Sequence, residues 1–285
     1  MTAAALTRSA LKDFPLPPVV DGDKESKGRI LILAGSRDVP GAALLCATAA
    51  MRSGAGKLKI ATGKSIAMAV GVAMPEAMVI GLTEHRDGQL AALAGDEIIN
   101  ESKDMDAIVA GPGLAGGPAC AIMAANLLKS PAPLVLDAAL LHALQPPDKP
   151  RASPPILLPH AGELSSLLKC EERDIDRDPL GCGRRAADRF GALVLVKGVT
   201  SHVVTPDGRA WTYRGGAPGL GVSGSGDVLA GIVGGLLARG SEPLTALLWS
   251  VLLHGEAGER LARHVGPIGF LAREIADELP GLLSC

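Results

Sequence analysis

Short runs of aliphatic residues recur along most of the chain, and many are followed by a glycine or proline and then by a stretch rich in alanine and leucine. Strand-like and helix-like segments that alternate in this way indicate βαβ units and a mainly parallel sheet. Right-handed crossovers then place helices on both faces of the sheet. The predicted strands are Ile30–Leu33, Leu58–Ala61, Met78–Ile80, Ala107–Val109, Leu134–Leu136, Ile156–Leu158 and Leu193–Val196. The predicted helices between them are Ala42–Arg52, Ala119–Leu128, Leu164–Leu168 and Arg184–Phe190.

The pattern changes after residue 197. The segments His202–Thr205 and Ala210–Tyr213 flank Pro206-Asp207-Gly208, a sequence typical of a tight turn, and predict an antiparallel hairpin at the sheet edge. Three further helices are expected at Val228–Ala238, Leu244–His264 and Leu271–Leu279. Because the sequence shows no repeat and no low-complexity linker, we expect residues 1–285 to form a single α/β domain, with residues 1–26 as an N-terminal extension.

The composition fits a sheet that is covered on both sides. Hydrophobic residues make up 47% of the chain but aromatic residues only 2%, so the core must consist of Ala, Val, Ile and Leu, as in buried parallel strands. The formal net charge is -2 and the basic residues are dispersed, which argues against a nucleic-acid-binding protein. The sequence contains no apolar run of the roughly 18 residues that a membrane helix needs. It also shows no secretory signal, so we expect a soluble protein.

The five cysteines form no CxxC pair, and their odd number does not favour a disulfide framework. A reducing, cytoplasmic environment is therefore expected. We interpret Cys46 and Cys120 as small buried residues, because free cysteine is among the residue types most often found in protein interiors.

The segment with the clearest chemical meaning is the glycine-rich sequence Gly219–Asp227, which leads directly into the helix predicted at Val228–Ala238. Closely spaced glycines let backbone N–H groups point toward one place, and a helix start adds unpaired N–H groups and a positive dipole end. Such a site suits a phosphate or a transferring phosphoryl group. Asp227 is either an N-cap of this helix or a general base acting on a hydroxyl. The segment matches neither a Walker A loop nor a dinucleotide-binding fingerprint.

Several further motifs occur in a fixed order along nearly the whole chain. They are Lys27-Gly28-Arg29, Ala34-Gly35-Ser36, Pro40-Gly41-Ala42-Ala43, Arg52-Ser53-Gly54-Ala55-Gly56, Gly111-Pro112-Gly113-Leu114, Val135-Leu136-Asp137-Ala138, Leu158-Pro159-His160 with Gly162-Glu163, Lys197-Gly198 and Gly224-Ser225-Gly226-Asp227. Together they resemble the ADP/ATP-dependent NAD(P)H-hydrate dehydratases, a branch of the ribokinase-like superfamily. The resemblance implies a ribokinase-like three-layer sandwich, with a mainly parallel central sheet, helices on both faces and an antiparallel edge hairpin.

The resemblance also implies a reaction, the ADP- or ATP-dependent dehydration of hydrated NADH or NADPH. A phosphoryl group passes to the C6 hydroxyl of the hydrated nicotinamide, and elimination of phosphate restores the reduced ring. Asp227 matches the catalytic aspartate, and Gly224, Ser225 and Gly226 match the anion hole. The residues that match contacts to the adenine nucleotide are Lys197, Gly198, Val199, Thr200, Ser201 and Gly226.

The same resemblance implies a substrate surface and a metal contact. The residues that match contacts to the hydrated cofactor are Ala42, Ala43, Gly113, His160 and Asp227. Glu163 matches a glutamate that superfamily members use near magnesium, usually through water. His160 could also be an ordinary surface or core histidine, and Lys197 a solvated lysine. Their positions at the carboxyl ends of predicted parallel strands favour contact with a ligand for both.

The sequence departs from the family pattern at two positions. Ala161 stands where the family often has proline, which changes the stiffness of the loop more than its chemistry. Ala139 stands where a second aspartate often follows Asp137, so no carboxylate role exists there. Asp137 itself remains a candidate for placing a metal or a loop.

The expected ligands are ADP or ATP as co-substrate and Mg²⁺, because phosphoryl transfer requires neutralisation of the phosphate charges. The resemblance implies a homo-oligomer, commonly a tetramer, for which Leu244–Leu253 is a candidate interface, and a separate epimerase for the hydrate. Two other functions stay open. A hydroxyethylthiazole or pyridoxal type of small-molecule kinase would share the fold and Asp227. A nucleotide-binding sensor without catalysis would keep the loop but not need the aspartate.

Overall fold

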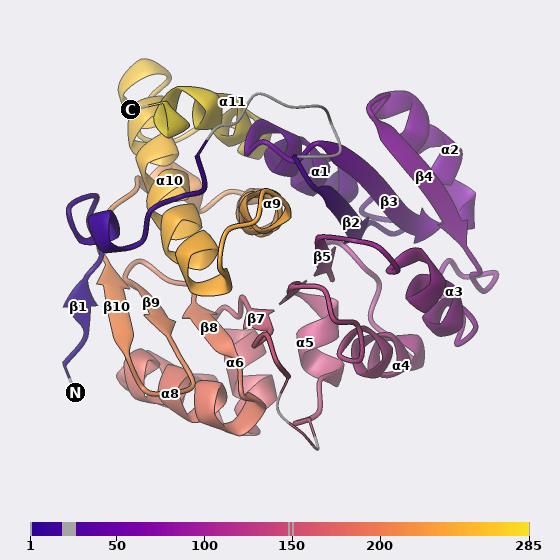
Figure 1. Cartoon of the computed structure of the whole chain (residues 1–285), viewed down its shortest axis with the longest axis horizontal. Coiled ribbons are helices and arrows are strands. Elements are labelled where there is room, and N and C mark those ends of the chain that lie inside the picture. The colour runs from indigo at the N-terminus through magenta and orange to yellow at the C-terminus, as the bar shows by residue number, and fades with distance from the viewer. Residues whose placement is uncertain (1, 19–26, 148, 150, 285) are drawn as a thin grey trace.

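The computed structural model describes residues 2–18, 27–147, 149 and 151–284. Within these residues ten strands form one sheet in the order β1-β10-β9-β8-β7-β6-β5-β2-β3-β4 (Figure 1). The strands are β1 (Ala4–Ala5), β2 (Arg29–Leu33), β3 (Lys57–Gly63), β4 (Ala77–Leu82), β5 (Ala107–Ala110), β6 (Leu134–Leu136), β7 (Ile156–Leu157), β8 (Leu193–Val196), β9 (Ser201–Val204) and β10 (Ala210–Tyr213). The seven strands from β8 to β4 in this order are mutually parallel, and β9 and β10 form the antiparallel hairpin.

Helices cover both faces of the sheet, as the alternating pattern predicts. One face carries α1 (Gly41–Arg52), α2 (Lys64–Ala73), α9 (Ser225–Ala238), α10 (Pro243–His264) and α11 (Ala272–Leu283). The other carries α3 (Ala94–Glu101), α4 (Pro118–Leu127), α5 (Ala139–Ala143), α6 (Ala161–Leu168), α7 (Glu172–Arg177) and α8 (Pro179–Phe190). Figure 1 shows the first group above the sheet and the second below it. The predicted α/β class is confirmed.

Alternate residues of the central strands explain this three-layer arrangement. Ile30 and Ile32 of β2 pack into the core cluster under α1 and α9, whereas Leu31 and Leu33 pack into the cluster on the opposite face. All four side chains are fully buried. Because successive side chains of a strand point to opposite faces, a continuous aliphatic run is the sequence of a strand that is covered twice. Cys46 and Cys120 are buried as predicted.

The N-terminal residues extend the sheet beyond the predicted hairpin. Strand β1 pairs with β10 and lies outside it. The sequence-based prediction that the hairpin forms the edge of the sheet is therefore wrong. Arg8 binds Glu256 of α10 with an Nη2–Oε2 distance of 2.7 Å, and Trp249 donates its indole N–H to the Phe14 carbonyl at 2.7 Å. These contacts tie the segment that follows β1 to the long helix α10. Strand β1 itself has only two residues and is too short to be recognised from its sequence. The single-domain boundaries stay a prediction.

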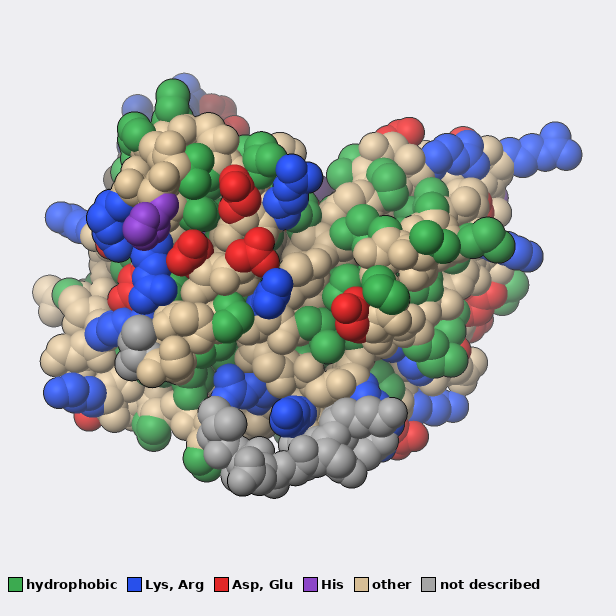
Figure 2. Space-filling view, turned by 90° about the horizontal axis from the view of Figure 1, so that it is seen from above, with side chains coloured by type: hydrophobic (Ala, Val, Ile, Leu, Met, Phe, Trp, Pro, Cys, Tyr) green, Lys and Arg blue, Asp and Glu red, His purple; other side chains and the backbone are tan. Residues whose placement is uncertain are grey.

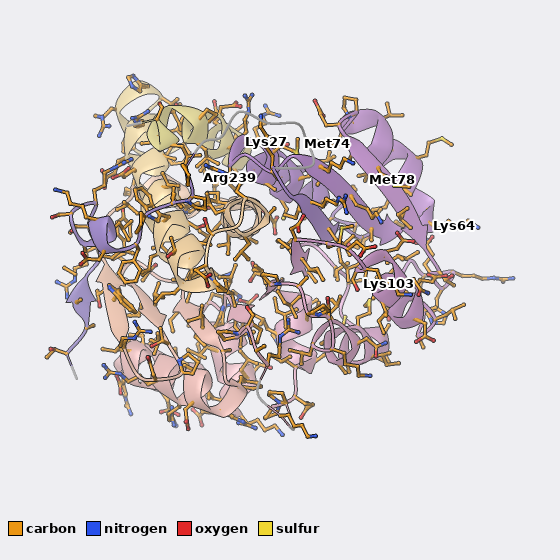
Figure 3. All side chains as sticks on the ribbon, viewed as in Figure 1. Lys27, Lys64, Met74, Met78, Lys103 and Arg239 are labelled. Atoms are coloured by element: carbon orange, nitrogen blue, oxygen red, sulfur yellow. The ribbon has the colours of Figure 1, made fainter. Side chains whose placement is uncertain are left out.

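The opposite end of the sheet exposes apolar side chains. On α2, Met68 and Val72 are 83% and 81% exposed, and only Ile66 and Val70 are buried. Figure 2 shows apolar side chains gathered on this part of the molecule, and Figure 3 labels Lys64 and Met78 nearby on α2 and β4. In the described part of the chain, no helix is both long and apolar enough to cross a membrane.

Candidate active site

The carboxyl ends of five parallel strands bring the predicted site residues to one edge of the sheet. Gly35 follows β2, Gly113 follows β5, Asp137 follows β6, His160 follows β7 and Lys197 follows β8. These five strands are neighbours in the sheet, in the order β8-β7-β6-β5-β2. Ligands of open α/β sheets bind at this edge. The fold therefore assembles residues that lie far apart in the sequence.

The glycine-rich loop places Asp227 in the first turn of α9. This helix begins at Ser225, three residues earlier than the sequence pattern predicts, because Gly224 adopts a φ of +89° and serves as its N-cap. Asp227 is therefore the third residue of the helix, and the interpretation of its carboxylate as an N-cap is wrong. A Cβ on Gly224 would overlap Leu45 of α1 and would lie 3.2 Å from the Cβ of Ala272 in α11. Only glycine fits this close approach.

The environment of Asp227 favours its protonated form. Burial raises its pKa most, the negative charge of Asp137 adds to the shift and the positive charge of Lys197 opposes it, so that the pKa lies at about 6. A carboxylate with a pKa near neutrality is well suited to remove and return a proton, because it exchanges protons readily at physiological pH.

Lys197 forms an ion pair under the anion site. Its Nζ lies 2.8 Å from Oδ1 of Asp137 and 3.8 Å from Oε2 of Glu163. Burial alone lowers the pKa of Lys197, but the two carboxylates raise it above its usual value, so the ammonium is charged. A Cβ on Gly226 would lie 3.6 Å from this Nζ. The ammonium therefore stands beside the backbone of the glycine-rich loop, where a bound phosphate would meet it.

The turn after β6 holds Asp137 in place. Asp137 is 2% exposed, and its carboxylate also accepts the backbone N–H of Ala138 at 2.9 Å. Ala138 has a φ of +49°, which is unfavourable for an L-residue by about 1–3 kcal/mol. Burial raises the pKa of Asp137, and the Lys197 ammonium opposes that shift. The sequence marked Asp137 as a candidate but gave no sign of its partner, which lies 60 residues away.

His160 and Glu163 form a reciprocal cap at the start of α6. The Glu163 carboxylate accepts the His160 backbone N–H at 2.8 Å, and His160 Nδ1 accepts the Gly162 N–H at 3.1 Å. The His160 side chain is 59% exposed, so its ring remains accessible to a substrate, whereas that of Glu163 is 7% exposed.

The donor set does not form a protein metal cage. Both oxygens of the Glu163 carboxylate already have partners. Oε2 accepts the His160 backbone N–H and lies 3.8 Å from Lys197 Nζ, and Oε1 lies 3.4 Å from His160 Nε2. Among the described residues, no group of three or more His, Cys, Asp and Glu side chains is placed to hold a metal ion. A Mg²⁺ ion would therefore have to rely on nucleotide phosphates and water, and the direct role of Glu163 stays a prediction.

Small residues pack closely beside the loop and form a floor in which Ala42 and Ala43 are themselves buried. A Cβ on Gly113 would overlap the Cβ of Ala42, and a Cβ on Gly35 would lie 3.2 Å from the Cβ of Ala43. The structure thus brings together Ala42, Ala43 and Gly113, whose proximity could not be predicted from the sequence. Leu45, which packs against Gly224, belongs to the same helix α1. The floor and the anion site therefore share one support.

The turn between β8 and β9 lies at the other side of the site. It contains Gly198, Val199 and Thr200, and the Val199 side chain is fully exposed at 100%. Ser201 Oγ donates to the Gly198 carbonyl at 3.2 Å, which stabilises the turn. The exposed Val199 therefore offers an apolar surface two residues from the half-buried Lys197.

A cavity of about 540 Å³ extends the site on the face that carries α4 and α5. Sequence reasoning did not find it, because its wall is mostly small or apolar and has no motif of its own. The lining residues are Leu114, Gly116, Gly117, Cys120, Ala138, Ala139, His142, Ala143 and Glu163. Glu163 connects this cavity to Lys197 and therefore to the anion site.

A glycine-rich helix start with a carboxyl group of raised pKa, beside a lysine at a parallel strand end, is an arrangement suited to an α/β enzyme that transfers phosphoryl groups. The chain belongs to the NAD(P)H-hydrate dehydratase family, since the family model of that description matches residues 30–281.

Similar proteins agree with this assignment. The ADP-dependent (S)-NAD(P)H-hydrate dehydratase of Xanthomonas campestris is 44% identical over 281 residues, covering 98% of this chain and 95% of the relative. The bifunctional NAD(P)H-hydrate repair enzyme of Moorella thermoacetica is 34% identical over 92% of this chain, which spans 50% of that enzyme.

Solved structures extend the comparison to the fold. The ADP/ATP-dependent NAD(P)H-hydrate dehydratase of Bacillus subtilis, co-crystallized with ATP/Mg²⁺, matches with a TM-score of 0.86 and 29% identity, covering 100% of this chain and 99% of that one. A ribokinase-like superfamily protein of Enterococcus faecalis has a TM-score of 0.82 at 24% identity, covering 99% of this chain and 95% of that one. The predicted ribokinase-like fold is confirmed.

Proposed function

We propose that this protein uses ADP or ATP to dehydrate hydrated NADH or NADPH. The observation that carries the proposal is the position of Asp227, a half-buried carboxylate with a pKa of about 6 at the glycine-rich start of α9. Family membership supports the substrate class, because the relatives with this fold and sequence bear the name of that reaction.

In the proposed mechanism, the Asp227 carboxylate removes the proton from the C6 hydroxyl of the hydrated nicotinamide. The hydroxyl oxygen then forms a bond to the terminal phosphorus of the nucleotide, and the bond from that phosphorus to the bridging oxygen breaks. AMP is released when ADP is the donor. The C6–O bond of the phosphate ester then breaks and inorganic phosphate leaves with that electron pair. The neighbouring ring carbon loses a proton to solvent, and the electrons of its C–H bond form the double bond that restores the reduced nicotinamide.

The charge that develops on the phosphoryl group has two sources of stabilisation. The backbone N–H groups of Gly224 and Gly226 lie at the start of α9, and the Lys197 ammonium supplies a positive charge next to Gly226. The Ser225 N–H, which the resemblance also assigned to the anion hole, is donated to the Val222 carbonyl at 3.2 Å. Asp137 and Glu163 keep that ammonium charged and in place. Donors that are already oriented need no reorganisation during the reaction, which is the main electrostatic route to rate enhancement.

The remaining contacts follow from the layout of the strand ends. We propose that the segment from Lys197 to Ser201 binds the nucleotide, with the exposed Val199 against its base. The small-residue floor of Ala42, Ala43 and Gly113, together with the His160 ring, binds the hydrated cofactor. Mg²⁺ supplies charge neutralisation on the nucleotide phosphates.

The wider context is proposed from the relatives and the composition. We propose that a separate NAD(P)H-hydrate epimerase acts together with this protein; the name of the bifunctional Moorella repair enzyme supports a second activity in the same repair. We also propose a cytoplasmic homotetramer of single-domain subunits.

The test is an assay with hydrated NADPH, Mg²⁺ and either ADP or ATP, which follows the absorbance of reduced nicotinamide and the release of phosphate. Asp227→Asn serves as the inactive variant, and Asp188→Asn, at an exposed position of α8, is its matched control. We expect absorbance to return only with nucleotide, and to do so in the control but not in Asp227→Asn. Phosphorylation of a small alcohol, without return of the absorbance, would instead support the vitamin-kinase alternative.

A further inference from the structure

His254 lies in the middle of α10 and contacts the first residue of α9. Its Nε2 is 3.0 Å from Ser225 Oγ and 3.1 Å from the Ser225 carbonyl oxygen. Ser225 is buried and stands between Gly224 and Gly226, the two glycines of the anion site. A single side chain of α10 therefore reaches both the backbone and the hydroxyl of the residue at the centre of this loop.

These two contacts define where the hydrogen of the imidazole lies. A carbonyl oxygen only accepts hydrogen bonds, so the contact to the Ser225 carbonyl requires Nε2 to carry the hydrogen. In the other tautomer, two lone pairs would face each other across 3.1 Å. The same N–H also faces Ser225 Oγ, which therefore accepts from the ring. The hydroxyl hydrogen of Ser225 is then not donated to His254 and is left for another acceptor.

The surroundings keep this ring neutral. Burial lowers the pKa of His254 most, the positive charge of Lys197 adds to the shift and the hydrogen bond to the Ser225 carbonyl opposes it, so that the pKa lies at about 4. The ring therefore retains one N–H in the pH range in which a carboxylate with a pKa near 6 is ionised.

We propose that His254 is a positioning residue that holds Ser225 through both oxygens, so that the Ser225 hydroxyl donates its hydrogen to the transferring phosphoryl group. The inference rests on the proposed dehydration reaction and assigns the hydroxyl, not only the backbone, a part in it. A purely structural role of His254, as a link between α9 and α10, is the alternative that an experiment must separate.

The experiment compares His254→Leu, His254→Gln, Ser225→Ala and the double variant His254→Leu/Ser225→Ala in the dehydration assay. Leucine removes the donor, and the glutamine amide can replace it. Loss of one oriented donor lowers kcat by about 100-fold or more. For His254→Leu, which acts indirectly, we expect a fall of about 10-fold or more with little change in the nucleotide KM, and substantial recovery in His254→Gln.

The double variant decides between the two roles. If His254 acts through the Ser225 hydroxyl, the double variant is no slower than Ser225→Ala, because residues in one network are not additive. The inference would be overturned if the fold-losses in kcat of the two single variants multiply in the double variant. It would also be overturned if His254→Leu lowers only the melting temperature and leaves kcat unchanged. Failure of the unmodified protein to dehydrate the hydrate would refute the proposed function and this inference with it. An active protein with unaffected variants refutes the inference alone.

Discussion

Replacing Asp137 with asparagine should move the acid limb of the pH–rate profile to lower pH. Asp137 raises the pKa of Asp227 by charge repulsion, and it also neutralises Lys197, whose positive charge lowers that pKa. The substitution removes the repulsion and frees the lysine charge at the same time. Both changes favour the ionised form of Asp227, so the pKa of this carboxyl must fall.

The size of the shift follows from Coulomb's law. Lys197 Nζ contacts Asp137 at 2.8 Å and lies beside Gly226, the residue before Asp227, so the carboxylates are close neighbours. At an effective dielectric constant of about 20, unit charges roughly 8 Å apart interact by about 2 kcal/mol. Because Asp227 is half-buried, solvent reduces this value, and we expect a downward shift of about one pKa unit, or about 1.4 kcal/mol.

The assay is the pH dependence of kcat/KM for the hydrate, which reports the pKa of the essential base in the free enzyme. For the unmodified protein we expect activity to fall as the pH drops through about 6, because Asp227 must be ionised to act as a base. Asp188→Asn, which removes an exposed carboxylate of α8, is the control, and its acid limb should keep the same position. An acid limb that stays in place or moves to higher pH in Asp137→Asn would refute the electrostatic reasoning.

Three other substitutions test separate parts of the account. Lys197→Met should shift the acid limb to higher pH, opposite to Asp137→Asn, and raise the nucleotide KM; an unshifted limb contradicts the proposed lysine position. Gly113→Ala should lower stability by about 1–2 kcal/mol, because of its φ of +62° and the overlap with Ala42, while Gly116→Ala, with open space around it, should change little in thermal denaturation. Arg8→Ala should cost about 1–2 kcal/mol in denaturant unfolding with kcat unchanged, since it breaks the bonds to Glu256 and to the Leu282 carbonyl that hold the N-terminal segment on α10 and α11; a large fall in kcat contradicts this.

The sequence predicted the layered architecture because strands covered on both faces must be continuously aliphatic, as in β2 and β8. Helix α2 was not predicted from the sequence, because only two of its residues are buried and no clear apolar stripe marks it. Strand β1 escaped because two alanines carry no strand signal, and its pairing depends on β10 alone.

The candidate site divides in the same way. The motifs identified the loop before Asp227 and the strand-end residues, since glycine spacing and strand ends can be recognised in a sequence. The Lys197–Asp137 ion pair and the His254–Ser225 contact could not be predicted, because each joins segments that meet only in the folded chain. The alternative interpretation of Asp227 as a cap is wrong, because the left-handed Gly224 starts the helix earlier than the apolar pattern does.

The most direct test of the central claim is a product balance. Equal amounts of protein, hydrated NADPH and ADP are mixed with Mg²⁺, and AMP, free phosphate and NADPH are quantified together. We predict that the three products appear in equal amounts and that Asp227→Asn forms none of them. AMP without NADPH, or a stable phosphorylated nucleotide that accumulates in place of free phosphate, would contradict dehydration and identify the protein as a kinase.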